Sequence, residues 1–111
     1  MRPSEIDWRS GKVVFWDLGS VDLQRPLREQ VSELKEDLAQ VEFPGRILID
    51  VGWYPEFSIK GAFRISVVRN SNWDEPLLQE ACPSGTVLVA SLKKAIALAE
   101  SVATRKPDEI S

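Results

Sequence analysis

Two stretches of the chain alternate between apolar and polar residues, RILIDVGWY at 46–54 and AFRISVV at 62–68, with the segment PEFSIKG between them at 55–61. Alternation with a period of two is typical of strands that bury one face. A hairpin centred on Ser58 brings the apolar sides of both strands together, because it pairs Trp53 with Phe63, Val51 with Ile65 and Ile49 with Val67. Coincidence of the apolar sides fixes the register of such a pair. We therefore expect an antiparallel hairpin at the centre of the fold.

Further strand and turn signals follow the hairpin. The cluster Asn70-Ser71-Asn72 indicates a turn, and residues 76–82 can form a third strand that begins at Pro76, as edge strands often do. Pro83-Ser84-Gly85 turns the chain again, and residues 86–89 can form another short strand. Ser91 is a suitable N-cap for a last helix, whose inner stripe would be Leu92, Ala95, Ile96, Ala99 and Val102.

Upstream of the hairpin, the spacing of the apolar residues changes. From Pro26 to Val41 they recur at intervals of three and four residues, at Leu27, Val31, Leu34, Leu38 and Val41. This spacing predicts an amphipathic helix that is ended by Pro44-Gly45.

The N-terminal segment has two interpretations. Ile6, Trp8, Val13 and Phe15 flank Ser10-Gly11, which fits a hairpin with a two-residue turn. A short helix before a single strand at 12–16 is the alternative.

Together these segments predict one α+β domain, 1–111, with a largely antiparallel sheet of three to five strands and two amphipathic helices on one face. A chain of 111 residues is long enough for one hydrophobic core. Residues 105–111 have the composition of a frayed polar tail. If both helices cover the side of the sheet that carries Ile49 and Trp53, the other side faces solvent or a partner.

The composition excludes several classes of chemistry. The chain has no histidine and one cysteine, Cys82, so it cannot supply Ser-His-Asp or Cys-His catalysis, a histidine-ligated metal or an internal disulfide. Its glycines form no phosphate-binding loop, and its carboxylates lack EF-hand spacing. We therefore expect a non-enzymatic protein with no catalytic residues, no cofactor and no metal.

Charge and hydropathy restrict the partners. A net charge of −3 argues against nucleic acid, which requires clustered positive charge. The longest charge-free run, residues 81–92, is shorter than the ~20 apolar residues of a membrane span. The N-terminus lacks the apolar core of a signal peptide, and Cys82, expected to be a small buried hydrophobe, suits a reducing compartment. We expect a cytoplasmic protein that binds neither nucleic acid nor membrane.

The candidate binding residues lie on the uncovered side of the hairpin and in the loops at its ends. Asp50 is expected opposite Ser66 and diagonal to Arg64, a spacing more typical of a cross-strand ion pair than of a catalytic pair. The loops carry aromatic residues beside carboxylates, a combination typical of protein-binding hot spots, with packing onto the core as the alternative. The candidate partner-binding set is Asp50, Tyr54, Glu56, Phe57, Arg64, Trp73, Asp74 and Glu75.

The run LIDVGWYPE at 48–56, the strand FRISVV at 63–68, Trp73 and the Leu-rich last helix together resemble small α+β immunity proteins of bacterial polymorphic-toxin and contact-dependent inhibition systems. The resemblance covers about residues 21–104. It implies a cytoplasmic protein without enzymatic activity that binds a cognate toxin domain and blocks or distorts its active site. The anchor residues that it implies are Asp50, Tyr54, Glu56, Trp73, Asp74 and Glu75. The net charge of −3 is mild for an inhibitor of a basic nuclease.

Two other classes of function fit the same sequence. A structural or regulatory subunit would self-associate, as a homodimer for example, through the uncovered sheet face or an edge strand. A small-ligand binder or carboxylate-dependent enzyme would use Asp50, Arg64 and Tyr54, and it would need a deep pocket around them.

Overall fold

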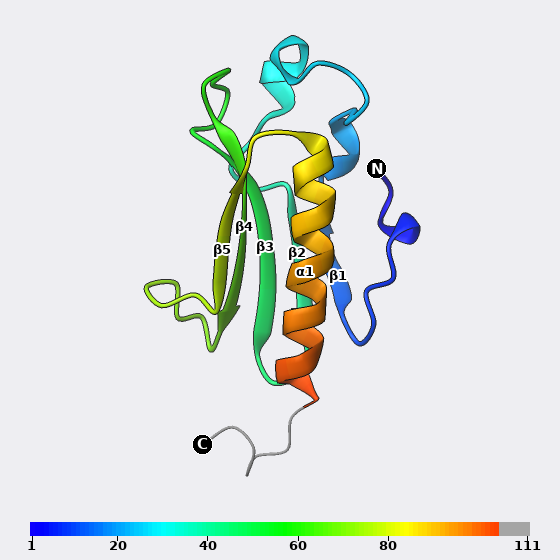
Figure 1. Ribbon diagram of the computed structural model, residues 1–111, viewed down its shortest axis with the longest axis vertical. Coiled ribbons are helices and arrows are strands. Elements are labelled where there is room, and N and C mark those ends of the chain that lie inside the picture. Colours follow the sequence, from blue (N-terminus) through cyan, green and yellow to red (C-terminus); the bar gives the residue numbers. More distant parts are fainter. Residues whose placement is uncertain (105–111) are drawn as a thin grey trace.

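The computed structural model describes residues 1–104 and contains one antiparallel sheet with the strand order β1-β2-β3-β4-β5 (Figure 1). Within these residues a single α-helix packs on the sheet, one short 3-10 helix precedes β1, and two others lie between β1 and β2. The strands are β1 (Lys12–Trp16), β2 (Ala39–Phe43), β3 (Ile47–Tyr54), β4 (Ala62–Arg69) and β5 (Leu78–Cys82). The helices are η1 (Pro3–Glu5), η2 (Leu18–Ser20), η3 (Leu27–Glu33) and α1 (Gly85–Ala103). The prediction of an α+β fold with an antiparallel sheet is confirmed.

The central hairpin has the register that the sequence predicts. β3 pairs with β4, and Trp53 lies opposite Phe63. The next two pairs on the same face are Val51 with Ile65 and Ile49 with Val67. The Trp53 and Phe63 rings meet edge to face, with centroids 4.9 Å apart. All of these side chains are buried, because α1 lies over this side of the sheet.

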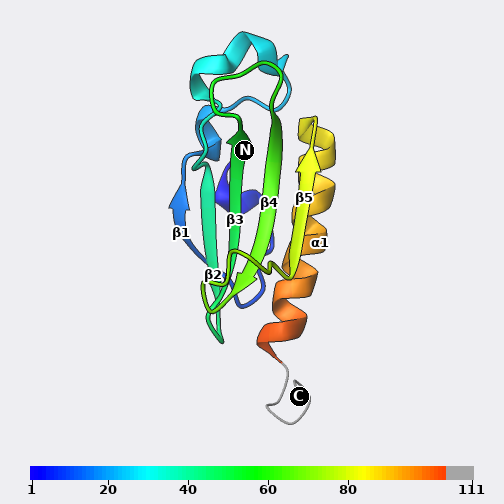
Figure 2. The ribbon, with the colours of Figure 1, turned by 90° about the vertical axis from the view of Figure 1, so that its left-hand side faces the viewer.

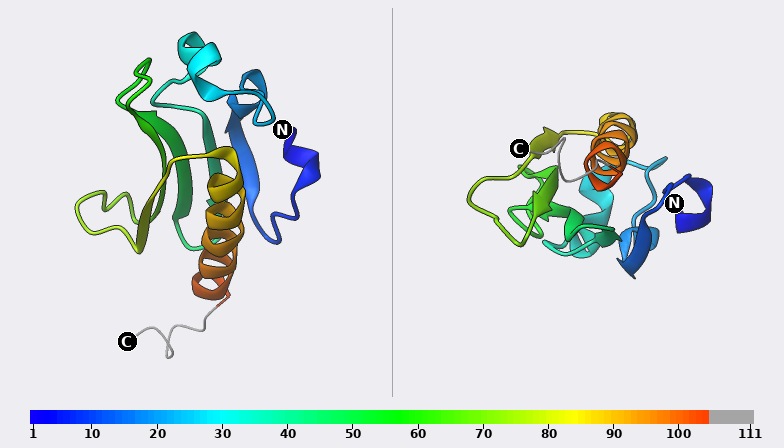
Figure 3. Two further views of the ribbon diagram at one scale, coloured as in Figure 1. Left: turned by 45° about the horizontal axis from the view of Figure 1, so that its top comes forward. Right: turned by 90° about the horizontal axis from the view of Figure 1, so that it is seen from below.

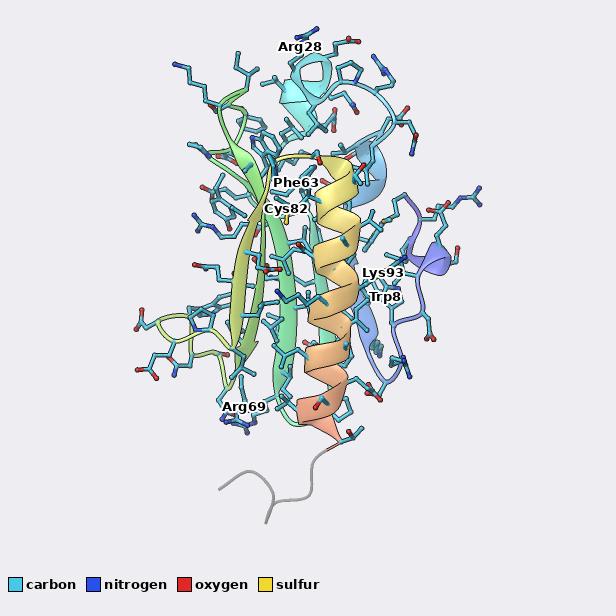
Figure 4. All side chains as sticks on the ribbon, viewed as in Figure 1. Trp8, Arg28, Phe63, Arg69, Cys82 and Lys93 are labelled. Carbon is cyan, nitrogen blue, oxygen red and sulfur yellow. The ribbon has the colours of Figure 1, made fainter. Side chains whose placement is uncertain are left out.

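Helix α1 supplies the other half of the core. Its buried residues are Leu88, Leu92, Ala95, Ile96, Ala99 and Val102, which include the whole predicted stripe. Figure 4 shows Phe63 and Cys82 beside the first turns of α1, and Cys82 is buried at the end of β5 as predicted. The expected strand at 86–89 and the expected N-cap at Ser91 are wrong. Leu88 continues the stripe by one turn, and the Ser84 side chain caps the helix by accepting from the Val87 N–H at 3.3 Å.

The predicted helix from Pro26 to Val41 is also wrong in its second half. Only 27–33 is helical, as the 3-10 helix η3, which lies beyond one end of the sheet (Figure 1). At Gln30 the backbone leaves helical geometry, and its side-chain amide instead bonds to the backbone N–H and carbonyl of Asp22 at 2.7 and 2.8 Å. Val41 lies in β2, where pairing with strands on both sides outweighs local helix propensity.

The N-terminal segment follows the second of its two interpretations, a short helix and then one strand. The expected hairpin does not form, because β1 pairs with β2, with a bulge between Val13 and Phe15. Trp8 and Trp16 instead meet edge to face at 5.7 Å, and Ser10 donates to Glu100 on α1 from both its backbone N–H and its hydroxyl.

The remaining predictions concern the edges and ends of the sheet. The turn at 70–72 is present, and β5 is an edge strand as predicted. The predicted tail, 105–111, lies outside the described residues. None of the helices in residues 1–104 combines the length and apolarity needed to cross a membrane.

Candidate functional site

The side of the sheet away from α1 forms the candidate site, and we call it the outer face. Figure 2 looks onto it. Side chains of Gln40, Asp50, Tyr54, Arg64 and Ser66 lie there, because strand residues alternate between faces. The loops 55–61 and 70–77 leave opposite ends of β4 and both project from this side (Figures 1 and 3). The eight residues of β4 separate them by roughly 25 Å.

Gly52 allows a second segment of the chain to cross the outer face. The Trp53 N–H donates to the Lys35 carbonyl at 2.8 Å, and the Leu38 N–H donates to the Val51 carbonyl at 2.9 Å. Between these two bonds the backbone of Glu36 passes directly over Gly52, so that a Cβ there would lie 1.8 Å from the Glu36 carbonyl oxygen. The absence of a side chain at residue 52 thus places the carboxylates of Glu36 and Asp37 on the outer face.

Asp50 is a nearly buried carboxylate at the centre of this face. It is 8% exposed and lies opposite Ser66, as predicted. The Gln40 side-chain amide donates to Asp50 Oδ1 at 3.1 Å. Burial raises the pKa of Asp50, the Gln40 hydrogen bond lowers it, and the nearby Asp37 raises it further. The charged form of Asp50 is therefore less favourable in the folded protein than in the unfolded chain.

Arg64 does not form the predicted ion pair with Asp50. Among the described residues the partner of Asp50 is Gln40, while the Arg64 guanidinium lies over the Tyr54 ring, 4.3 Å from its centroid. A planar guanidinium can stack on an aromatic face and remain hydrated, which a cross-strand ion pair with a buried carboxylate would not allow.

Tyr54 lies within the negative field of three carboxylates. Burial raises the pKa of its hydroxyl, and Asp50, Glu36 and Asp37 raise it further, while Arg64 lowers it. Each of these acids acts on Tyr54 through its charge. Tyr54 ends β3, so the outer face is acidic between Asp50 and the loop 55–61, and the Arg64 guanidinium stacks on the Tyr54 ring there.

The two loops present their aromatic side chains to solvent. Phe57 is 51% exposed and Trp73 is 50% exposed, so the alternative in which they pack onto the core is wrong. Phe57 also has a φ of +60°, a conformation that costs a residue with a side chain about 1–2 kcal/mol. Its N–H donates to the Leu34 carbonyl at 2.7 Å, which holds the loop in place.

The predicted residues therefore form three groups on one side of the molecule. Asp50, Tyr54 and Arg64 lie at the centre, Glu56 and Phe57 lie in one loop, and Trp73, Asp74 and Glu75 lie in the other. All three acidic loop residues are exposed. The two loops do not meet, and only a partner that spans the face can touch both.

Sequence reasoning missed Glu36, Asp37 and Gln40, because it placed them on a helix. The available signal was Gly52, since a glycine inside a strand often marks a close approach of another backbone.

Two hollows open onto the outer face, and neither is lined by Asp50, Tyr54 or Arg64. One, lined by Phe15, Asp37 and Gln40, has a volume of about 210 Å³, whereas ligand pockets usually measure about 300–1,000 Å³. The other has a volume of about 540 Å³ and lies at the far end of the sheet from Tyr54, where Leu48, Val68 and Asn70 line it. A broad surface with projecting loops fits a macromolecular partner better than a metabolite.

Asp50 provides a direct test of how this face is built. Because its folded-state pKa is raised, the native protein binds the proton more tightly than the unfolded chain, and stability falls as pH rises from the unfolded pKa through the folded one. We expect Asp50→Asn to raise the free energy of unfolding at pH 7, with the bond from Gln40 retained, and to remove this decline. Urea unfolding at a series of pH values measures both effects, and a less stable Asn variant at pH 7 would contradict the assignment.

Comparison of the chain with models of protein families, with curated proteins and with solved structures gave no match.

Proposed function

We propose that this protein is an immunity protein: a non-enzymatic, cytoplasmic inhibitor that neutralises a cognate bacterial toxin by binding it through the outer face. The observation that carries the proposal is the pair of half-exposed aromatics, Phe57 and Trp73, on loops that flank an acidic centre on one side of the sheet.

The size of the face suits a protein partner. A standard interface buries about 800 Å² on each side, which corresponds to a patch roughly 28 Å across. The two loops lie roughly 25 Å apart at the ends of β4. A toxin domain that contacts both loops would therefore cover the central carboxylates completely.

The chemistry of the face supports fast and durable binding. Exposed carboxylates at Glu56, Asp74 and Glu75 increase the rate of encounter with a basic surface, while aromatic side chains that become desolvated slow dissociation. A toxin that acts on phosphate-containing substrates must carry positive charge at its active site. The acidic centre around Tyr54 is complementary to such a site.

Two features of the face lower the stability of the free protein. Asp50 is buried with a raised pKa, and Phe57 adopts a left-handed backbone conformation without burying its ring. Features that reduce stability are commonly kept at sites of function. Both would gain from a partner, because a cation would stabilise the Asp50 carboxylate and an apolar surface would cover Phe57.

The proposal is tested with the protein domains encoded by the genes next to this one, each first expressed alone to find those that are toxic. Titration calorimetry of the purified protein against each domain is expected to find one that forms a tight one-to-one complex. The activity of that domain should be lost when the protein is added. Absence of a complex with every neighbouring domain would overturn the proposal.

The matched control is Val87→Ala. Val87 is also an exposed apolar residue, but it lies on α1, across the sheet from the outer face. We expect this variant to bind like the wild type.

A further inference from the structure

Strand β1 forms one border of the sheet, and its far edge is open. Figure 2 shows β1 at the border of the sheet with no further strand beyond it, while the N-terminal segment packs on β1 through the contact of Trp8 with Trp16. Within residues 1–104 the backbone of β1 is hydrogen-bonded to β2 and to no other segment. An edge with unpaired N–H and C=O groups is a template for another strand.

The side chains of β1 do not protect this edge. Val14 is 45% exposed and Phe15 is 41% exposed, and no charge or proline interrupts residues 13–16. The other edge strand, β5, is guarded in the usual way, because prolines flank it and Glu80 pairs across to Lys94 on α1 at 2.8 Å. β1 therefore lacks the flanking prolines and the charged pair of β5, and its bulge is the feature that can blunt its edge.

We infer that β1 pairs antiparallel with β1 of a second copy of this chain. The sequence Lys12-Val13-Val14-Phe15-Trp16-Asp17 begins with a cation, ends with an anion and is apolar between them. A two-fold axis between Val14 and Phe15 places each Lys12 opposite Asp17 of the second copy and matches the four apolar residues with one another. A parallel arrangement would place like charges together, which is unfavourable.

Asp17 can accept this additional cation. Its Oδ2 contacts Lys35 Nζ at 2.8 Å, which leaves Oδ1 to accept from Lys12 of the second copy. The bulge at Val14 increases the local twist, so the pairing covers only these six residues. Such a contact buries less than the roughly 1,200 Å² at which the range of standard interfaces begins, and the dimer is weak and reversible.

Self-association at β1 involves Phe15 at the border of the outer face and leaves the part of this face on β3 and β4 accessible. β1 is separated from β3 by β2, so Tyr54 and both loops remain free to bind another protein. This inference therefore does not depend on the proposed function, and its failure would leave that proposal unchanged.

Sedimentation velocity of the full chain tests the inference. Protein concentrations from about 10 µM to about 1 mM cover the dissociation constants expected of a weak interface. We expect a monomer–dimer equilibrium and, for Val14→Lys, a dissociation constant raised at least about tenfold. Val87→Lys is the matched control, because Val87 is 39% exposed on α1, and it should dimerise like the wild type. A protein that is monomeric throughout, or a dimer that Val14→Lys does not weaken, would overturn the inference.

A charge exchange tests the orientation. Lys12→Glu and Asp17→Lys should each weaken the dimer, because each places like charges opposite one another, and the double variant should recover most of the association. A double variant weaker than both single variants would contradict the antiparallel register. Thermal melting of each variant confirms that the monomer remains folded.

Discussion

Gly52→Ala is expected to destabilise the protein by about 3 kcal/mol or more, since a backbone clash of this kind exceeds ordinary overpacking. The added Cβ would lie 1.8 Å from the Glu36 carbonyl oxygen and 2.8 Å from the Glu36 carbonyl carbon. These are backbone atoms held by flanking bonds from Trp53 and Leu38, so they cannot move without breaking the bonds that join this segment to β3. For a domain of this size such a loss lowers the melting temperature by more than about 10 °C.

Gly19→Ala is the matched control for this variant. The nearest heavy atom to a Cβ at Gly19 is the Met1 carbonyl oxygen at 3.5 Å, which is an ordinary contact distance. We expect a change of no more than about 0.5 kcal/mol. Calorimetric melting of both variants measures the difference, and equal stabilities would show that Glu36 does not cross Gly52 as described.

Trp73→Ala is expected to weaken toxin binding by about 2 kcal/mol, or roughly thirtyfold, as truncation of an interface tryptophan commonly does. The free protein should keep its stability within about 0.5 kcal/mol, because half of the side chain is already in water. The loss should appear mainly as faster dissociation. Surface plasmon resonance with the cognate domain measures it, and wild-type dissociation would remove Trp73 from the interface.

Phe57→Gly tests whether the loop 55–61 also contacts the proposed partner. Glycine adopts a positive φ without steric cost, so the variant should be at least as stable as the wild type even though it loses an aromatic contact with the partner. A variant with unchanged stability and weakened binding separates a role in recognition from a role in folding.

The central hairpin and the last helix could be predicted from the sequence, because the spacing of apolar residues in each is compatible with a single structure. The long alternation at 46–54 and 62–68 admits a single register that buries both apolar sides, and β3 and β4 have that register. The stripe from Leu92 to Val102 likewise fits only a helix, and α1 contains it.

The segment before the hairpin could not be predicted in the same way. Leu34 and Leu38 are spaced as on a helix, yet both are buried next to an irregular backbone that leads into β2. What decides their structure is pairing with β1 and β3, which is long-range and leaves no signature within residues 34–38 themselves. The position of Glu36 and Asp37 depends on that pairing, so two of the three carboxylates around Tyr54 were beyond local reasoning.

The exposure of the loop aromatics was equally undetermined. Whether Phe57 faces the core or the solvent depends on its positive φ and on the bond from its N–H to the Leu34 carbonyl. The bond depends on where η3 ends, since Leu34 is its C-cap residue, and the loop sequence does not contain that information.

The most direct measurement of the central claim is a binding titration of the cognate toxic domain with the wild type, with Val87→Ala and with the double variant Phe57→Gly/Trp73→Ala. The proposed interface predicts a tight one-to-one complex for the first two proteins and a loss of at least a hundredfold for the third, whose melting temperature should not fall. A double variant that binds and inhibits as well as the wild type would contradict the claim that this protein acts through its outer face.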